Sequence, residues 1–391
     1  MSLVYIVAGE ASGDALGARL LAALRARRPD LAFAGIGGER LAEQGMPSLF
    51  PMRELALMGL IEVLPNLRNL TRRMAETVAD ITARRPTVIV TIDSPGFALR
   101  LAERVRPLGI PIVHYVAPQI WAWRPGRVAK IRARVDRILC LLPFETVIFE
   151  AAGIPASFVG HPVLESGAGT GDAARFRATH DIAPDAALLL VMPGSRRMEA
   201  KRLLPIFGAA LRLLAARIPG LRAVIAVSPV VADAVRAGVA DWPGRPVLVD
   251  TLAAKHDAFA AAAQSGGAGL IKSGTSSLEM AVAGVPHVVS YRVNPITAAI
   301  VRRLVQVRFA SLVNLLAERE IAPEFIQDRA TPEALSEALH RLLTDPAAAA
   351  AQRAAFAPVL AQLHPPGLAP SEAAAEAVLE QIAGGRNRPE S

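Results

Sequence analysis

Short apolar runs alternate along most of the chain with longer segments in which Ala, Leu and Arg recur at helical spacing. Nine of these runs have the length and composition of buried strands. They lie at residues 3–9, 86–93, 110–118, 137–143, 188–194, 223–229, 246–250, 268–274 and 286–291. Continuous apolar strands separated by helices are typical of parallel sheets with both faces covered. The pattern therefore predicts a doubly wound α/β fold.

The predicted strands fall into two groups, separated by a stretch rich in Gly, Ser and Thr near residue 166. A chain of 391 residues exceeds what one hydrophobic core usually supports, so two domains are expected. We place an N-terminal domain at 1–165 and a C-terminal domain at 166–350. The remaining residues, 351–391, are expected to form helices that pack back toward the N-terminal domain. Thr331 followed by Pro predicts the start of one further helix.

Composition narrows the class of protein. No apolar run reaches the ~18 residues of a membrane span. The N-terminus lacks the basic region of a signal peptide, and the single cysteine, Cys140, excludes an internal disulfide, so we expect a cytosolic location. The net charge of +8 suits nucleic acid, an anionic membrane surface or an acidic substrate. Aromatic residues make up only 5% and no nucleic-acid motif is present, so nucleic acid is the least favoured partner.

Polar residues gather where the predicted strands of the first half end. In "AGEASGD", Glu10, Ser12 and Gly13 either line a ligand or serve the turn and the helix start. Asp93 in "IDSPGF" is either a cap or a general base. Ligands of such sheets bind beyond the carboxyl ends of the strands, so both motifs are candidate sites.

The next strand end, "HYVAPQIWAWRPGR", holds His114, Trp121 and Trp123. The two tryptophans indicate a loop that shapes a pocket, or they belong to the core. His114 is either a base or a structural residue. We interpret His161, in "FVGHP", as part of the interdomain geometry.

Two loops of the second half suit an anion. "MPGSR" contains Gly194, Ser195 and Arg196, and "KSGTSSLEM" presents backbone N–H groups and hydroxyls at a helix start. The second loop contains Lys272, Ser273, Gly274, Thr275, Ser276, Ser277 and Glu279. Together the loops fit a diphosphate, although neither has P-loop spacing. Glu279 either accepts from ribose hydroxyls or is an ordinary acid of a first helical turn. No cluster has metal-ligand spacing, so we expect no metal.

The segment from Leu55 to Met74 mixes apolar and basic residues. It either lies on a membrane surface or forms a core helix with a basic outer face. A similar mixed segment, at residues 296–309, favours surface binding. The membrane-facing residues that we predict are Met58, Ile61, Val63, Leu64, Leu67 and Leu70.

In their order, these motifs resemble those of the lipid-A-disaccharide synthase family. The matching signatures are "GEASGD", "MGLIEVL", "IDSPGF", "HYVAPQIWAWR", "LPFE", "FVGHP", "PGSR" with Glu199, "SGTSSLE", and "SLVNLLAERE" leading to "PEF" and Gln327. They run through nearly the whole chain. Two residues depart from the family pattern: Val313 stands where proline is usual, and Lys272 replaces a small residue.

The resemblance implies an inverting GT-B glycosyltransferase with two Rossmann-like domains and no cofactor. The implied donor is UDP-2,3-diacylglucosamine and the implied acceptor is 2,3-diacylglucosamine 1-phosphate (lipid X). Their products are lipid A disaccharide 1-phosphate and UDP. The implied location is peripheral, on the cytoplasmic face of the inner membrane. The oligomeric state is open, with a homodimer as one expectation.

The resemblance also suggests roles for single residues. Asp93 and Arg196 are the expected catalytic residues, with His114 left open as the alternative base. The expected donor-site residues are Gly194, Ser195, Arg196, Ser273, Gly274, Thr275, Ser276, Glu279, Asn314 and Gln327. The expected acceptor-site residues are Glu10, Ser12, Gly13 and Trp121. Two alternatives remain: another GT-B enzyme such as a UDP-N-acetylglucosamine 2-epimerase, and a non-catalytic nucleotide- or lipid-binding protein.

Overall fold

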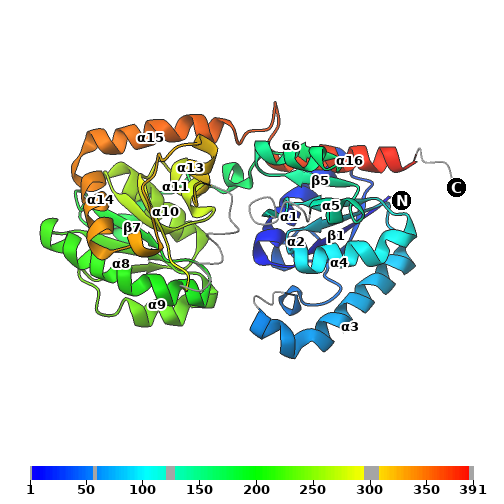
Figure 1. The fold of residues 1–391 in the computed structure, drawn as a ribbon, viewed down its shortest axis with the longest axis horizontal. Helices are drawn as coiled ribbons and strands as arrows, with labels where there is room; N and C mark the ends of the chain where they lie inside the picture. Colours follow the sequence, from blue (N-terminus) through cyan, green and yellow to red (C-terminus); the bar gives the residue numbers. More distant parts are fainter. Residues whose placement is uncertain (1, 56–59, 120–127, 295–307, 387–391) are drawn as a thin grey trace. The chain divides into compact units, whose positions relative to one another are not determined.

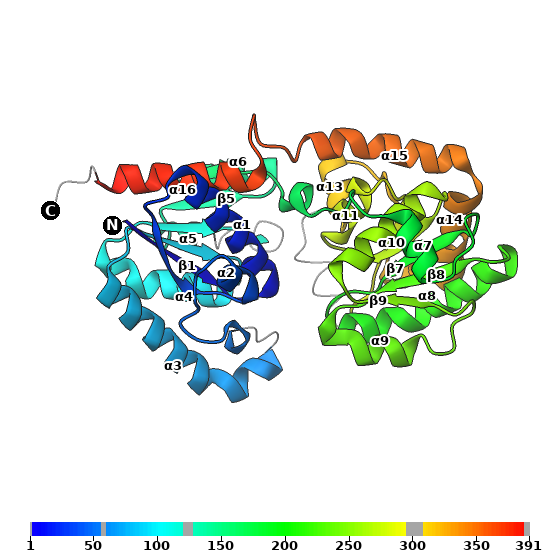
Figure 2. The same cartoon turned by 180° about the vertical axis from the view of Figure 1, so that it is seen from behind.

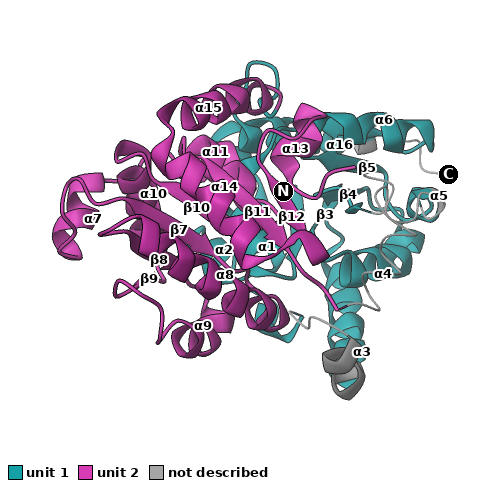
Figure 3. Cartoon of the chain, turned by 60° about the vertical axis from the view of Figure 1, so that its left-hand side comes forward, with its two compact units in different colours: residues 1–162, 363–391 teal, residues 163–362 magenta. Residues whose placement is uncertain are grey.

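The computed structural model describes residues 2–55, 60–119, 128–294 and 308–386. The chain forms two compact units, which Figure 3 distinguishes by colour. Unit 1 consists of residues 1–162 and 363–391, and unit 2 of residues 163–362. Each unit contains a six-stranded sheet whose paired strands are all parallel.

The sheet of unit 1 has the strand order β2-β1-β3-β4-β5-β6. Its strands are β1 (Leu3–Ala8), β2 (Ala32–Ile36), β3 (Val88–Ile92), β4 (Ile112–Tyr115), β5 (Arg137–Cys140) and β6 (Ala156–Phe158). Alternate residues of β1 enter different cores, since Val4 and Ile6 pack in one cluster and Tyr5 and Val7 in another. All four side chains are buried, as expected for a parallel sheet covered on both faces.

Helices cover both faces of this sheet (Figure 1). They are α1 (Ala11–Arg27), α2 (Glu39–Glu43), α3 (Leu60–Arg84), α4 (Pro95–Val105), α5 (Val128–Arg132), α6 (Pro143–Ala151) and α16 (Pro370–Arg386). Helices α1 and α16 pack together against one core, and α3 and α4 pack together against the other. The C-terminal helix thus completes the layer that the N-terminal helix begins.

The sheet of unit 2 has the order β12-β11-β10-β7-β8-β9. Its strands are β7 (Leu188–Met192), β8 (Arg222–Ala226), β9 (Val247–Val249), β10 (Ala268–Lys272), β11 (His287–Tyr291) and β12 (Glu324–Ile326). The helices described in this unit are α7 (Ala173–Thr179), α8 (Arg197–Arg217), α9 (Ala232–Gly238), α10 (Leu252–Gln264), α11 (Ser276–Val282), α13 (Leu312–Ala317), α14 (Pro332–Thr344) and α15 (Pro346–Ala361), and Figure 2 shows most of them from behind. Helices α8, α9 and α14 share one core with the strands.

All nine predicted strand runs contain a strand, and the doubly wound α/β class is confirmed. Among the described residues, the prediction missed β2, β6 and β12. All three lie at the edges of their sheets, and β6 and β12 have only three residues each. β6 and β12 are too short to form a recognisable apolar run, and β2 ("AFAGI") consists mainly of Ala and Gly, which are uncommon in strands.

The boundaries of the two units differ from the predicted domain boundaries. The divisions fall after Pro162 and Gln362, whereas the sequence suggested 165 and 350. The later division follows from α15, which packs against α11, α13 and α14 and so stays with unit 2. Near both divisions the backbone N–H of His161 donates to the carbonyl of Leu363 at 3.0 Å. This hydrogen bond joins the segment that leaves unit 1 to the segment that returns to it.

The helix start predicted at Thr331 is confirmed. Thr331 caps α14, because its hydroxyl accepts from the N–H of Ala334. Asp345 caps α15 in the same way, by accepting from Ala347 and Ala348. Gln352 then fastens α15 to β11: its amide accepts from the N–H of His287 and donates to the carbonyl of the same residue.

The predicted membrane segment falls mostly outside the described residues. Met58 lies outside them, as do the side chains of Ile61, Val63, Leu64 and Leu67 in α3. Leu70 is partly buried against the core of unit 1. Within the described part of the chain, no helix is both long and apolar enough to cross a membrane.

Helix α3 is anchored by Arg73, whose guanidinium is mostly buried. It pairs with Glu54 at 2.6 Å and with Glu76 at 2.7 Å, and it lies over the ring of Phe50. The charged hydrogen bonds and the stacking of this guanidinium fix α3 to the loop that precedes it.

Asp14 holds the start of a neighbouring helix. It lies inside α1, and its carboxylate accepts from the N–H groups of Gly38, Arg40 and Leu41 at the start of α2.

We predict that Asp14→Ala lowers the free energy of unfolding by about 2 kcal/mol, because these N–H groups lose their partner. Urea denaturation measures this, with the exposed Ser12→Ala as the control. Equal stability of the two variants would contradict the assignment.

Candidate functional site

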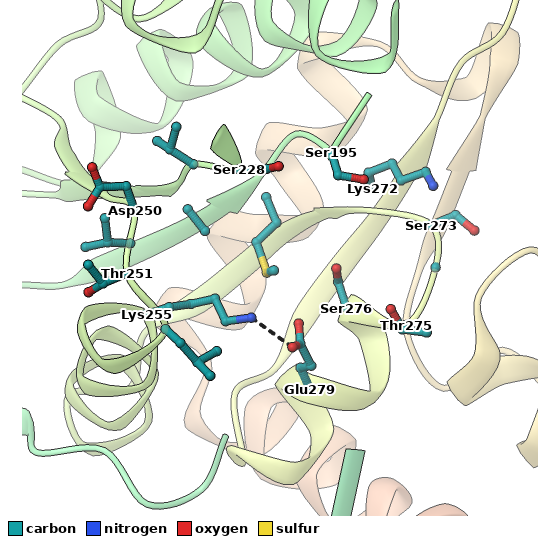
Figure 4. A pocket seen from close by; sticks show the side chains of 17 residues that line it. Ser195, Ser228, Asp250, Thr251, Lys255, Lys272, Ser273, Thr275, Ser276 and Glu279 are labelled. Atoms are coloured by element: carbon teal, nitrogen blue, oxygen red, sulfur yellow. Dashed lines mark hydrogen bonds and ion pairs between the residues drawn. The ribbon is translucent and has the colours of Figure 1, made fainter. Parts of the chain in front are cut away.

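A cavity of about 390 Å³ opens at the carboxyl ends of β7, β8, β9 and β10 in unit 2 (Figure 4). It is lined by Gly194, Ser195, Ser273, Gly274, Thr275, Ser276 and Glu279 from the two predicted anion loops, together with residues that follow β8 and β9. The parallel strands place the loops that follow them at the same edge, so segments distant in sequence meet here.

The loop from β7 to α8 turns at Gly194, whose φ is 106°. A Cβ at this position would also lie 2.6 Å from Oε2 of Glu199, so the carboxylate would have to shift to admit a side chain. Arg196 is the N-cap of α8, with extended backbone and an exposed side chain. The turn therefore leaves Ser195 and Arg196 exposed at the edge of the sheet, where backbone N–H groups of α8 begin.

Glu199 lies one turn into α8, and its side chain is only 10% exposed. Its Oε1 lies 3.4 Å from Nη1 of Arg196 and 3.2 Å from Nζ of Lys272. Lys272 is the last residue of β10, so this carboxylate joins the two anion loops. Oε2 of Glu199 has no hydrogen-bond partner among the described residues.

The loop from β10 to α11 contains Gly274, whose φ is 151°. Thr275 and Ser276 stand at the start of α11 and line the cavity (Figure 4). Ser273 is fixed from outside the cavity, because its hydroxyl donates to the carbonyl of Ala310 at 2.5 Å. Hydroxyls and free N–H groups at a helix start suit an anionic ligand.

Glu279, in the first turn of α11, pairs with Lys255 of α10 at 2.8 Å, and Figure 4 shows the two side chains pointing toward each other. Both side chains are about one-fifth exposed. The pair leaves Oε2 of Glu279 available to a hydroxyl of a ligand in the cavity.

The residues that follow β8 and β9 in the cavity were not predicted from the sequence. Ser228 follows β8, Asp250 and Thr251 follow β9, and Lys255 lies in the helix after them. The rule that found the other loops applies to these as well, since "AVIAVSP" and "PVLVDT" each end in polar residues.

Asn314 and Gln327 do not line this cavity. Asn314 is fully buried; its amide donates to Glu324 and to the carbonyl of Ala322 and accepts from the N–H groups of Ile321 and Ala322. The amide of Gln327 bonds to the backbone of Val293 at 3.2 and 3.3 Å.

Glu324, which the sequence analysis did not select, connects Asn314 to the anion loop. Its carboxylate accepts from the N–H of Ala310, from the N–H and hydroxyl of Ser311, and from Asn314. Ala310 in turn accepts from Ser273. Val313 is a buried residue of α13 in the same region, so the segment that departs from the family pattern is helical.

In unit 1, Asp93 follows β3 in a left-handed conformation, with φ of 51°, and Ser94 follows with φ of 43°. Two such residues in succession cost roughly 1–3 kcal/mol each, so the surrounding structure must hold them. The N–H of Asp93 donates to the carbonyl of Tyr115 at 2.9 Å, and the carbonyl of Ser94 accepts from the first turn of α4. The turn directs a half-buried carboxylate to the edge of the sheet.

The loop after β1 lies against the loop of Asp93, because β1 and β3 are neighbours in the sheet. A Cβ on Gly9 would lie 2.6 Å from Oγ of Ser94, and Gly13 is packed against the carbonyl of Ile92. Glu10 is the N-cap of α1 and Ser12 is exposed in its first turn. The structure thus brings Glu10, Ser12 and Gly13 to the same edge as Asp93. Trp121 lies outside the described residues.

His114 is sealed inside unit 1, with no exposed surface. Its Nδ1 lies 2.8 Å from the hydroxyl of Thr91, and its Nε2 has no partner among the described residues. Burial lowers the pKa of His114 to about 4. His161 is also buried, and burial lowers its pKa to about 4. Both imidazoles are therefore neutral near pH 7, and His114 is shielded from a substrate in solution.

The described residues contain no group of three or more His, Cys, Asp or Glu side chains arranged to hold a metal ion. Cys140 is buried in β5, and burial raises the pKa of its thiol.

Comparison with known proteins settles the family. The family model for lipid-A-disaccharide synthetase matches residues 4–378. The lipid-A-disaccharide synthase of Granulibacter bethesdensis is 53% identical over 392 residues, which cover 97% of this chain and 98% of that protein. The chain belongs to the lipid-A-disaccharide synthase family. It is therefore a glycosyltransferase, as the motifs suggested.

The fold is also that of known sugar-nucleotide enzymes. A Staphylococcus aureus MnaA structure containing UDP matches with a TM-score of 0.69 and 13% identity, over 99% of this chain and 97% of that one. The UDP-GlcNAc 2-epimerase of Neisseria meningitidis, bound to UDP-GlcNAc, matches with a TM-score of 0.64 and 12% identity, over 98% and 100%. At such identities the likeness shows the fold alone, which is GT-B. Membership of the lipid-A-disaccharide synthase family thus favours glycosyl transfer over the epimerase and the non-catalytic alternatives.

The contact between Gly194 and Glu199 predicts a position-specific effect. We expect Gly194→Ala to lower the free energy of unfolding by about 3 kcal/mol, from a strained φ and from the overlap of its Cβ with the carboxylate. Gly220 is the matched control: its φ is 77°, and nothing lies within 4 Å of its added Cβ. Gly220→Ala should cost only the backbone strain, about 1 kcal/mol. Equal losses in denaturant titrations would show that Glu199 does not occupy the space beside Gly194.

Proposed function

We propose that the chain transfers the sugar of UDP-2,3-diacylglucosamine to 2,3-diacylglucosamine 1-phosphate, with UDP as the second product. The observation that carries the proposal is the cavity of unit 2, where two anion-binding loops meet in a member of the lipid-A-disaccharide synthase family. Its size and polar lining suit a sugar nucleotide.

The donor diphosphate is proposed to lie between the two anion loops. Arg196 and the helix start at Ser273 to Ser276 would contact it, and Glu279 would accept from a ribose hydroxyl. As the bond between the anomeric carbon and the diphosphate breaks, the bonding electron pair leaves with UDP. Groups fixed in advance around that charge bind the departing UDP more strongly than the donor, and thereby lower the barrier.

Asp93 is proposed as the general base. Its carboxylate takes the proton of the acceptor 6-hydroxyl while that oxygen forms a bond to the anomeric carbon, which inverts. The strained turn at Asp93 supports this role, since such turns concentrate at functional sites. Complete burial of His114 argues against the alternative base. Glu10, Ser12 and Gly13 share the edge with Asp93 and would hold the acceptor, together with Trp121.

Asn314 and Gln327 are proposed to support the donor site from behind. Asn314 and the N–H of Ala310 both donate to the carboxylate of Glu324, and the carbonyl of Ala310 accepts from the hydroxyl of Ser273. This chain of hydrogen bonds connects Asn314 to the anion loop. The bonds between Gln327 and Val293 hold the segment after β11.

Both substrates carry acyl chains, so we propose that the enzyme works at the cytoplasmic face of the inner membrane. The contact would be made by Met58, Ile61, Val63, Leu64, Leu67 and Leu70, beside the basic residues of α3. Assembly as a homodimer belongs to the same proposal.

The function is tested by UDP release from the purified protein with both acylated sugars in detergent micelles. We expect UDP and a disaccharide phosphate in equal amounts, and at least about a 100-fold slower release from Arg196→Ala. Unacylated UDP-N-acetylglucosamine serves as the control donor. Turnover of the control donor alone, or no turnover by folded protein, would contradict the proposal.

The base is tested separately. We expect Asp93→Asn to lower kcat by roughly 10²- to 10⁴-fold, since removal of a general base costs about that much. Glu103→Gln neutralises an exposed carboxylate of the neighbouring helix α4 and should leave kcat unchanged. An Asp93→Asn enzyme that keeps more than about one-tenth of the wild-type kcat would exclude Asp93 as the base.

A further inference from the structure

A negative charge lies close to the cavity of unit 2 and works against the proposed ligand. Glu199 is 10% exposed and lies beside Gly194, which lines the cavity. A buried carboxylate repels a diphosphate strongly, because little water lies between the charges. An anion site with such a group beside it requires cations that outweigh its charge.

Two cations meet Glu199 at the same oxygen. Nη1 of Arg196 and Nζ of Lys272 lie 3.4 and 3.2 Å from Oε1. Both contacts are longer than the 2.7–2.9 Å of an ideal charged hydrogen bond, so neither cation is fully committed to the carboxylate. With both present the three groups carry a net charge of +1, and without Lys272 the net charge is zero.

Lys272 is held more firmly than Arg196. Its side chain is 21% exposed, against 58% for Arg196. Its ammonium lies over the ring of Tyr291 at 5.4 Å, and the residue itself lines the cavity. A lysine ammonium has three donors, of which the contact with Glu199 uses one. The others are free to point to a ligand.

From this arrangement we infer that Lys272 is a phosphate-binding residue of the cavity, and that Glu199 is the positioning residue that holds its ammonium there. The inference rests on the proposed function, and it adds a second cationic side chain to Arg196 at the phosphate site. The ligand class is a nucleoside diphosphate or its sugar ester. Lys272 recognises the phosphates, whereas the nucleoside is bound elsewhere in the cavity.

The test is titration calorimetry with UDP and with uridine, on the whole protein. We expect Lys272→Met, which preserves volume, to raise the Kd of UDP by roughly 10- to 100-fold, since that is the usual worth of a charged hydrogen bond. The Kd of uridine should stay within about twofold. Lys201→Met is the matched control: it removes the same charge from an exposed position on α8 and should change neither Kd.

Lys272→Arg, which keeps the charge, should weaken UDP less than Lys272→Met does. If Lys272→Met unfolds, Lys272→Gln replaces it, with the same expectation. Wild-type affinity for UDP in the folded variant, or equal losses for UDP and uridine, would overturn the inference and leave the proposed function intact. Failure of the folded wild-type protein to bind UDP would overturn both.

Discussion

Parallel pairing of the strands is the constraint on which both candidate sites depend. Every strand of a parallel sheet ends at the same edge, so the loops that follow neighbouring strands are brought side by side whatever their separation in sequence. Gly194 and Thr275 lie about eighty residues apart in the chain and line one cavity because β7 and β10 are paired. The loops of Glu10 and Asp93 meet in unit 1 for the same reason, through the pairing of β1 and β3.

Buried carboxylates fix the irregular segments near the strand ends. Asp14 collects three N–H groups at the start of α2, and Glu324 collects four donors beneath the loop of Ser273. A carboxylate that receives several N–H bonds is stable inside a protein, and each bond fixes a piece of irregular backbone. Glu199 differs from them, since it is met by two side-chain cations at the edge of a cavity and keeps one oxygen without a partner among the described residues.

Much of this was visible in the sequence. The central strands are recognisable in the sequence as continuous apolar runs. The rule that ligands bind beyond the strand ends then identified the loops of Asp93, Arg196 and Ser276. The sequence alone did not reveal which way each polar side chain points. Asn314 was expected in the donor site and is sealed in a hydrogen-bond network, whereas Lys255 was overlooked and lines the cavity. Such assignments depend on which strands become neighbours and on how much solvent reaches a residue, and both are fixed only in the folded chain.

The central claim is a division of labour, in which unit 2 binds the nucleotide and Asp93 of unit 1 serves the acceptor. It is tested most directly by the Kd of UDP, measured by calorimetry for Asp93→Asn and for Arg196→Ala. The account predicts that Asp93→Asn binds UDP within about twofold of wild type, since a base for the acceptor does not contact UDP, and that Arg196→Ala binds at least about tenfold more weakly. Loss of UDP binding in folded Asp93→Asn, or unchanged binding in Arg196→Ala, would contradict it.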